Sequence, residues 1–452
     1  MDEIMNCMRC GYCLPACPTY RETGKESASP RGRIALMKAV ADGMLPVDEE
    51  FDHNMYLCLG CRACETACPS GVKYGRLVET ARDIIEETIP RSGKVRLARE
   101  IPMKWLFPHP KRMRVIGNLL WFYQKSGLQS FMRKSGLLKH FGPMGQMEAT
   151  LSTFASPKER NSRLKKMIAT SPIIDFPSRQ EAVAAAVPAL VESHEHQPGT
   201  RPLRVGLFVG CVMDTVFWHT NQATARVLAA AGCEVIFFSE QTCCGALHAH
   251  AGNKADALTL AKQNIQAFEK AGIDVMVNNA GGCGAALKEY DHWFHGDPEW
   301  EPRAKRFVEA SKDISEILVS LQLPALQSLD AIVTFQDSCH LRHGQKIFNQ
   351  PRQLLRSIPG ITYVELPEAD RCCGSAGIYN ITNEAMSMQI LDKKMQHVRG
   401  TKAKYVVTAN PGCLLQMRLG IQRAGLQDEM EAIHIVDLIE QALPNLNFVE
   451  SH

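Results

Sequence analysis

Two cysteine runs near the start of the sequence have the spacing by which thiolates bind iron–sulfur clusters. They are Cys7, Cys10, Cys13, Cys17 and Cys58, Cys61, Cys64, Cys68, each followed directly by proline. Both read C-x2-C-x2-C-x3-C-P, a ligand spacing of [4Fe–4S] clusters. Two intervening residues are just enough for successive sulfurs to reach different irons of one cubane. The chemistry that this pattern predicts is one-electron transfer.

The two runs resemble those of two-cluster ferredoxins, in which the fourth cysteine of each run binds the other cluster. We therefore predict two [4Fe–4S] clusters with crossed ligands. Set A is Cys7, Cys10, Cys13 and Cys68, and set B is Cys17, Cys58, Cys61 and Cys64. Zinc is the alternative, but it is often bound by two separated pairs, which leaves the three-plus-one runs unexplained.

Eight later cysteines form an internal repeat. Set C is Cys211, Cys243, Cys244 and Cys283, and set D is Cys339, Cys372, Cys373 and Cys413. The offsets from the first to the second cysteine are 32 and 33 residues, and those from the third to the fourth are 39 and 40. Adjacent thiolates repel unless a metal neutralises them, and Gly245 and Gly374 would let the backbone approach a bulky cluster. Sets C and D are therefore candidate ligands of one or two further iron–sulfur centres, with a redox-active disulfide or zinc as alternatives.

The elements that must position sets C and D are strands alternating with helices. Short apolar runs predict strands at 203–209, 234–238, 274–278, 331–335, 363–366 and 405–408, and a helix is expected at 215–231. The cysteines follow the strand ends, where open α/β sheets bind their ligands. Cys233 falls outside the pattern and is expected to be a buried apolar residue.

The chain divides into four parts. We expect a two-cluster ferredoxin domain at 1–90, a basic and partly helical connector with a flexible linker at 91–200, and Cys-Cys-Gly domains at 201–326 and 327–452. Helical spacing at 35–40 and 75–87 predicts that the first domain is helical. The expected fold class is α+β multidomain, with a helical two-[4Fe–4S] ferredoxin domain followed by two pseudo-symmetric α/β Cys-Cys-Gly domains.

The connector carries a strong charge bias. Residues 91–146 contain twelve Lys or Arg and one acidic residue, Glu100, with several aromatic residues among them. Such a segment could contact an anionic membrane surface or an acidic partner subunit, and a solvated face is the simpler alternative. No nucleic-acid recognition motif accompanies it. The alanine-rich and then His/Pro/Gly-rich stretch 182–199 suggests the flexible linker.

The location expected from the sequence is the cytoplasm. The cysteines are clustered at ligand spacings, and no signal peptide or apolar run of 18 residues occurs. Thiolates that bind iron must stay reduced, which favours a reducing compartment. We expect a cytoplasmic protein that is either free or peripheral on the inner face of the cell membrane.

Other motifs are weaker. Four histidines lie near sets C and D, and each could bind a metal, pass protons or make local hydrogen bonds. They are His248, His250, His340 and His343. No G-x-G-x-x-G or G-x-x-x-x-G-K-[ST] motif occurs, so we expect no flavin or nicotinamide in this chain.

The repeats resemble the Cys-Cys-Gly domains of the heterodisulfide reductase superfamily. The fuller motif of that superfamily, C-xn-CCG-xm-C-x-x-C, supplies five thiolates to a non-cubane [4Fe–4S] centre. This chain has Ala280 and Asn410 where the motif has the first cysteine of its final pair. The substitutions argue against a five-thiolate centre and against a chain that is a catalytic disulfide reductase.

The whole layout is similar to the family of glycolate oxidase iron–sulfur subunits. The segments that carry this resemblance are 30–34 (PRGRI), 243–247 (CCGAL), 282–284 (GCG) and 339–344 (CHLRHG). The resemblance implies an electron-transfer subunit that is not catalytic alone. It would take electrons from an FAD-containing subunit that oxidises glycolate to glyoxylate, and pass them to a quinone-type acceptor. Alternatives are the iron–sulfur subunit of an anaerobic glycerol-3-phosphate or lactate dehydrogenase, a heterodisulfide-reductase-like catalytic subunit, or a metal-stapled scaffold without electron flow.

Overall fold

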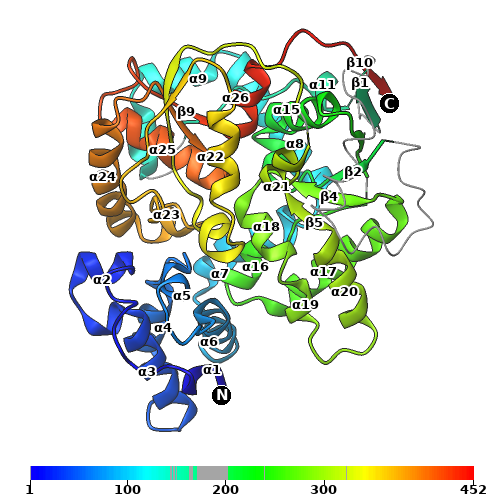
Figure 1. The fold of residues 1–452 in the computed structure, drawn as a ribbon. Coiled ribbons are helices and arrows are strands. Elements are labelled where there is room, and N and C mark those ends of the chain that lie inside the picture. The colour runs from blue at the N-terminus through cyan, green and yellow to red at the C-terminus, as the bar shows by residue number, and fades with distance from the viewer. Residues whose placement is uncertain are drawn as a thin grey trace.

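The structure, a computed structural model, describes residues 2–142, 145, 148, 150–161, 166–169, 202–238, 240–321 and 323–451. Figure 1 shows a helical N-terminal module (residues 2–88) in blue, below two larger α/β units in green to red. A helical connector joins them. The mixed helical and sheet architecture confirms the expected fold class, and the linker expected at 182–199 lies outside the described residues.

The N-terminal module is helical, as the spacing of its apolar residues predicts. Its helices are α1 (Asp2–Met5), α2 (Pro18–Thr23), η1 (Glu26–Ala28), α3 (Pro30–Ala41), α4 (Glu49–Tyr56), α5 (Ala63–Thr66) and α6 (Tyr74–Thr88). Proline starts α2 and α3, where its missing N–H leaves no helical bond unmade. Ser29 caps α3 by accepting a hydrogen bond from the Gly32 N–H, and Asp48 caps α4 in the same way.

The first α/β unit contains a six-stranded sheet. Its strands are β1 (Lys166–Ala169), β2 (Arg204–Leu207), β3 (Glu234–Ile236), β4 (Val275–Asn278), β5 (Ser311–Asp313) and β10 (Phe448–Ser451), in the order β10-β1-β3-β2-β4-β5. Strands β3, β2, β4 and β5 are parallel, whereas β1 pairs antiparallel with both β3 and β10. Its helices are α14 (Val212–Thr215), α15 (Trp218–Ala230), α16 (Ala246–His250), α17 (Lys254–Ala271), α18 (Gly281–Leu287), α19 (Tyr290–Trp293), α20 (Trp300–Ala310) and α21 (Ile314–Ser320).

The second α/β unit repeats the parallel part of the first. Its sheet has the order β7-β6-β8-β9, with β6 (Ala331–Phe335), β7 (Ile361–Tyr363), β8 (Tyr405–Thr408) and β9 (Glu431–His434). The order matches β3-β2-β4-β5, so the repeat in the sequence is a repeat of topology. Its helices are η4 (His340–Gly344), α22 (Asn349–Arg356), α23 (Tyr379–Thr382), α24 (Glu384–Gly400), α25 (Pro411–Arg423) and α26 (Ile435–Gln441).

Three details differ from the expectations. The helix expected at 215–231 is broken, because Phe217 leaves helical geometry and packs in the core between α14 and α15. Strand β7 starts two residues earlier than expected, since Ile361 pairs with Ala331. Strands β1, β5, β9 and β10 were not expected, and β10, which follows the second unit in sequence, completes the sheet of the first.

The two α/β units share their hydrophobic core. One buried cluster combines Val205 and Val277 of the first unit with Val333 and Val407 of the second. A second cluster joins Cys283 to Cys413 and their neighbours. Helices α15 and α26 pack against each other across the boundary. The units therefore form one body around a common interior.

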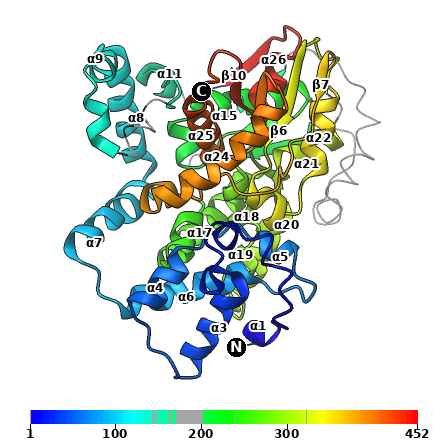
Figure 2. The ribbon, with the colours of Figure 1, turned by 90° about the vertical axis from the view of Figure 1, so that its left-hand side faces the viewer.

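The connector is a chain of short helices. It consists of α7 (Gly93–Glu100), the π-helical turn η2 (Ile101–Leu106), α8 (Pro110–Lys125), α9 (Leu128–Lys134), η3 (Leu137–Phe141) and α11 (Pro157–Asn161). Figure 2 shows α7, α8 and α9 in cyan, running along one side of the molecule from the N-terminal module to the α/β units. Within the described residues, no helix is both long enough and apolar enough to span a bilayer.

Candidate iron–sulfur sites

Set A lies at the surface end of the N-terminal module. All four of its cysteines line one cavity, together with Ile34, Val72 and Tyr74. Cys10 is exposed, and it is the one exposed cysteine of the chain, all of whose cysteines are described. Burial raises the pKa of Cys13 despite hydrogen bonds from the backbone. The structure thus brings the predicted set together, and the assignment of each ligand stays a prediction.

Set B lies in the interior, between the module and the second α/β unit. The electrostatic partners of Cys64 include Cys61, Cys58 and Cys17, so the crossed cysteine Cys17 lies with the second run. Burial raises the pKa of both Cys61 and Cys64 well above that of a free thiol. Buried thiols such as those of Cys61 and Cys64 are poorly suited to an apolar core, and a metal cluster would stabilise their thiolates.

A buried arginine supports a negative group at set B. Arg33 is 0% exposed, it donates to the Asn54 carbonyl oxygen at 2.7 Å, and its Nη1 has no hydrogen-bond partner among the described residues. Burial opposes its charge, but Tyr74, Cys58 and Cys17 hold the pKa of Arg33 above its ordinary value. Conversely, the pKa of Cys58 is lowered. Burial alone would raise this pKa, but the nearby charges of Arg33 and Arg82 outweigh the effect of burial. A buried charge of this kind needs a counter-charge, which a cluster with thiolate ligands would supply.

Set C gathers at the carboxyl ends of β2, β3 and β4. Cys211 follows β2, the Cys243–Cys244 pair follows β3, and Cys283 is in the first turn of α18 after β4. The Sγ atoms of Cys211 and Cys243 are 3.6 Å apart, and contacts continue from Cys243 through Cys244 to Cys283. This is the switch point of the sheet, the place where open α/β folds bind ligands.

Set D has the same arrangement on β6, β7 and β8. Its sulfurs form a continuous series of contacts from Cys339 through Cys372 and Cys373 to Cys413. The buried Lys394 is the nearby cation: burial lowers the pKa of Lys394, and Cys373 and Cys372 oppose that shift. The ammonium group donates to the Glu368 carbonyl oxygen at 2.5 Å. As at set B, a buried cation lies beside two cysteines of the set.

The glycines of the two Cys-Cys-Gly motifs have a backbone conformation that favours glycine. Gly245 and Gly374 have φ angles of 81° and 93°, which side chains other than glycine rarely adopt. A Cβ on Gly374 would also lie 2.6 Å from the Ser387 carbonyl oxygen in α24. The turn between the strand and the next helix therefore requires glycine at both positions. The Gly374 N–H also lies 3.4 Å from the Cys372 Sγ of set D, and the close approach of a cluster to the two glycines stays a prediction.

The four sets lie in a defined order. Cys61 of set B and Cys339 of set D belong to one buried cluster with Leu59 and Tyr379. The Tyr379 hydroxyl donates to the Leu57 carbonyl oxygen at 3.0 Å, which ties the set D loop to the set B loop. The cavity of set A is also lined by Cys64 of set B. Sets C and D adjoin through Cys283 and Cys413, so the order is A, B, D, C.

The four candidate histidines have mainly structural partners. His248 binds the Met103 carbonyl oxygen at 2.7 Å, and His343 lies between Thr66 (2.9 Å) and the Asp370 carbonyl oxygen (2.9 Å). His250 binds Glu79 at 2.7 Å and stacks on His340, with ring centroids 4.9 Å apart. The Nε2 atom of His340 is buried and has no partner among the described residues.

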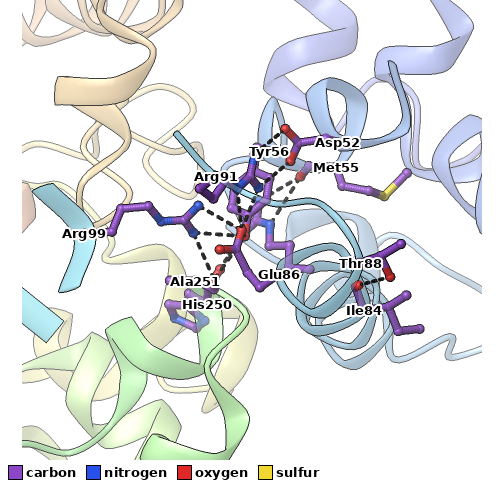
Figure 3. Close-up of polar contacts among 11 residues, drawn as sticks. Asp52, Met55, Tyr56, Ile84, Glu86, Thr88, Arg91, Arg99, His250 and Ala251 are labelled. Carbon is purple, nitrogen blue, oxygen red and sulfur yellow. Dashed lines mark hydrogen bonds and ion pairs between the residues drawn. The ribbon is translucent and has the colours of Figure 1, made fainter. Parts of the chain in front are cut away.

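A cluster of charged side chains fixes the module against the first α/β unit (Figure 3). The Tyr56 hydroxyl lies 2.8 Å from Glu86 and 3.0 Å from the Ala251 carbonyl oxygen, which follows α16. Arg99 of α7 binds Glu86 at 2.8 Å and the same carbonyl oxygen at 3.1 Å. Arg91 binds both Glu86 and Asp52. Three parts of the chain therefore meet at one hydrogen-bonded junction.

All seventeen cysteines are described, and none of them is in a disulfide. In the described part of the chain, no three Cys, His, Asp or Glu side chains converge on a point that could hold a single metal ion. A [4Fe–4S] cluster has one thiolate on each iron at separate corners, so its ligands surround a volume instead of a point.

Three family profiles match the chain over most of its length. They are described as "4Fe-4S dicluster domain" (residues 3–72), "Glycolate oxidase iron-sulfur subunit, linker region" (residues 94–151) and "Cysteine-rich domain" (residues 205–288 and 333–418). The probable glycolate oxidase iron–sulfur subunit of Bacillus subtilis is 48% identical, over 97% of this chain and 94% of that protein. The glycolate oxidase iron–sulfur subunit of Escherichia coli is 32% identical, over 98% and 95%.

The chain belongs to the family of glycolate oxidase iron–sulfur subunits. It is therefore an iron–sulfur electron-transfer subunit of an oxidoreductase, with a 4Fe–4S dicluster domain and two cysteine-rich domains. Lactate utilization protein A of Oceanobacillus iheyensis is 36% identical, over 52% of this chain and 96% of that protein. A hypothetical protein from Helicobacter pylori has a TM-score of 0.41 at 12% identity, over 82% of this chain and 77% of that one, which is too distant to carry an argument.

Sequence reasoning did not find the buried cations. Arg33, Arg82 and Lys394 lie beside sets B and D, yet in the sequence they are ordinary members of helices. The one available signal was the position of Arg33 between the two cysteine runs. The contact between Cys61 and Cys339 had no local signal, because it arises only when the module docks on the second α/β unit.

Proposed function

We propose that this chain transfers electrons between two partners. The donor is a flavoprotein that oxidises glycolate, and the acceptor is a quinone-type molecule. The observation that carries the proposal is the uninterrupted order of sets A, B, D and C, from a surface cysteine to a site beneath the connector. Iron–sulfur clusters bound to these sets would supply one-electron transfer. The residues of the chain hold the four sets in sequence and bury the inner ones.

Set A is the proposed entry side. Cys10 is exposed, and Met8 and Tyr12 beside it are 70% and 69% exposed. An exposed surface beside a candidate cluster ligand lets a partner protein approach the cluster closely. The remaining cysteines are buried or half-buried, so the flavoprotein subunit would dock at the Cys10 face.

Set C is the proposed exit side, because the connector covers it directly. The Thr242 hydroxyl, next to Cys243, donates to the Pro108 carbonyl oxygen at 2.8 Å. His248 binds the Met103 carbonyl oxygen on the other side of the Cys-Cys-Gly turn. Gly117 of α8 lies against Thr215, and a side chain at this position would collide with Arg160. The connector and set C are therefore packed as one unit.

The outer face of the connector has the character of a peripheral membrane contact. Val115, Leu119 and Phe122 lie on one face of α8 and are exposed, as are Leu128 and Phe131 of α9. Exposed cations accompany them: Lys111, Lys125, Arg133 and Lys134. Apolar side chains between basic ones favour an anionic bilayer surface. We propose that this face brings set C to a membrane that contains the quinone.

The test of electron transfer is EPR on the full chain, purified anaerobically together with its flavoprotein partner. Addition of glycolate should produce signals of reduced [4Fe–4S] clusters, and a soluble quinone should then abolish them. If glycolate leaves the clusters oxidised while dithionite reduces them, the proposed donor is wrong. Lactate as the substrate is the informative comparison, because relatives over half the chain are named for lactate utilization.

The test of the membrane contact is co-sedimentation with vesicles that contain anionic lipid. Phe122→Asp removes an apolar group that is 61% exposed and adds a repelling charge, so binding should fall about tenfold or more. Met44→Asp is the matched control, since Met44 is 70% exposed on the N-terminal module. Equal loss in both variants, or no loss in Phe122→Asp, would contradict the assignment of the membrane face.

A further inference from the structure

Asn410 bridges the two Cys-Cys-Gly sites. It is the residue before α25, and its Nδ2 lies 3.6 Å from the Sγ of Cys413 in set D. Its Oδ1 accepts a hydrogen bond from the Gly282 N–H at 3.0 Å, and Gly282 directly precedes Cys283 of set C. A neighbouring backbone bond, from the Gly281 N–H to the Ala409 carbonyl oxygen at 2.9 Å, holds the same two loops together.

The orientation of the Asn410 amide follows from its partners. A backbone N–H can only donate, so the amide oxygen must face Gly282. The amide NH2 group is then directed at the Cys413 sulfur. One side chain therefore satisfies a donor at the edge of set C and supplies a donor to set D.

The two sites differ at this position. Ala280 occupies the corresponding place before α18 and is buried, with a methyl group that cannot donate a hydrogen bond. Sets C and D otherwise follow equivalent strands of sheets with the same order. Of these two matched positions, only that of set D presents a side-chain N–H to a sulfur.

We propose that Asn410 is a positioning residue that raises the reduction potential of the centre at set D relative to the same site without it. Reduction adds negative charge to a cluster, and a hydrogen bond to a ligand sulfur stabilises that charge. This inference rests on the proposed function, because it requires that set D holds an iron–sulfur centre. The fit is supported by the buried Lys394 beside Cys372 and Cys373.

Three substitutions separate an effect of Asn410 on the reduction potential of set D from an effect on the stability of the fold. Asn410→Ala removes both hydrogen bonds. Asn410→Asp keeps an oxygen for the Gly282 N–H but replaces the donor at Cys413 with a negative charge. Ala280→Asn is the matched control, because it offers set C the kind of donor that set D has. Thermal unfolding of each variant reports the structural cost separately.

The experiment is an EPR-monitored redox titration of the full chain, purified anaerobically and loaded with iron and sulfide. We expect Asn410→Ala to lower the ratio of reduced to oxidised set D at a fixed potential about tenfold, a shift of about 59 mV for one electron. Asn410→Asp should lower the reduction potential of set D further. Ala280→Asn should raise the reduction potential of set C. The signals of sets A and B should stay in place in all three variants.

Two outcomes would overturn the inference. The first is a set D potential that is unchanged in Asn410→Ala and Asn410→Asp, even if both variants melt earlier. The second is an iron content of about eight per chain in the wild type, which would leave sets C and D without clusters. Neither outcome affects the reduction of sets A and B by glycolate, so failure here is distinguishable from failure of the proposed function.

Discussion

The N-terminal module and the α/β units hold their cysteines in opposite ways. In the module, the candidate ligands come from two short runs, and Cys7, Cys13, Cys58 and Cys68 themselves pack against a small core around Met55 and Ile85. In the α/β units, the cysteines lie at strand ends above a large core of Val, Ile and Leu. The difference predicts that clusters stabilise the fold of the first region, whereas the α/β units fold without them.

The largest expected effect is from removal of iron. Because bound metal contributes directly to the folding of small domains, chelation should unfold the module and leave the α/β sheets intact. Amide hydrogen exchange would show α3 and α6 losing protection while β2 and β6 keep it. Persistent protection of α3 and α6 in the iron-free chain would contradict the claim that the module depends on its clusters to fold.

A pair of matched substitutions sharpens the same contrast. Cys61 and Cys372 lie in one buried cluster but belong to sets B and D. Cys61→Ser should lose the cluster of set B and destabilise the module. Cys372→Ser should lose the centre of set D with a decrease in Tm of only a few degrees. Iron analysis and calorimetry on both variants are the measurements, and equal decreases in Tm would contradict the distinction.

The shared core of the α/β units should have its own pH dependence through His434. This side chain is fully buried, it donates from Nε2 to the Asn279 carbonyl oxygen at 2.9 Å, and its Nδ1 accepts the Val436 N–H. Burial lowers its pKa from 6.5 to about 4. The unfolded chain therefore binds the proton more readily, and the stabilisation, present above pH 6.5, is lost as the pH falls toward 4.

The expected size of this loss is up to about 3 kcal/mol. Urea unfolding between pH 7 and pH 4 would measure it, with His434→Gln as the comparison because glutamine does not titrate. The variant should show a smaller difference in free energy of unfolding between the two pH values than the wild type. An equal difference would remove His434 as the cause.

The smallest expected effect is at the junction in Figure 3. Tyr56→Phe removes a hydroxyl that contacts Glu86 and the Ala251 carbonyl oxygen, which should weaken docking of the module by about 1–2 kcal/mol. Limited proteolysis after α6 would detect the looser docking. Tyr12→Phe is the control, since Tyr12 is exposed, and it should leave the cleavage rate unchanged.

The sequence was sufficient to predict those helices and strands that have a local pattern of apolar residues. Strands such as β4, whose four residues are all buried, appear as short apolar runs. The cysteine spacings mark the two runs of the module and the repeat of the α/β units, whereas the crossed membership of sets A and B came from the resemblance to two-cluster ferredoxins. The fold class and the family also followed from these patterns.

What the sequence could not predict depends on contacts that are distant along the chain. Strand β5 is the polar segment Ser-Lys-Asp, and it is a strand only because it pairs with β4. The docking of Cys61 beside Cys339 depends on the surfaces of two separate parts. The bridging role of Asn410 likewise requires Gly282, 128 residues away, to be in place.

Strand β10 has a consequence for how the molecule is made. Lys166 of β1 pairs with Ser451, 285 residues later, so a strand made after the whole second α/β unit completes the sheet of the first one. Until then β1 presents an open edge, the kind that recruits other chains. Such a distant pairing also slows folding, since a long loop must close first. Premature termination would therefore leave an aggregation-prone sheet in a chain that already contains all seventeen cysteines.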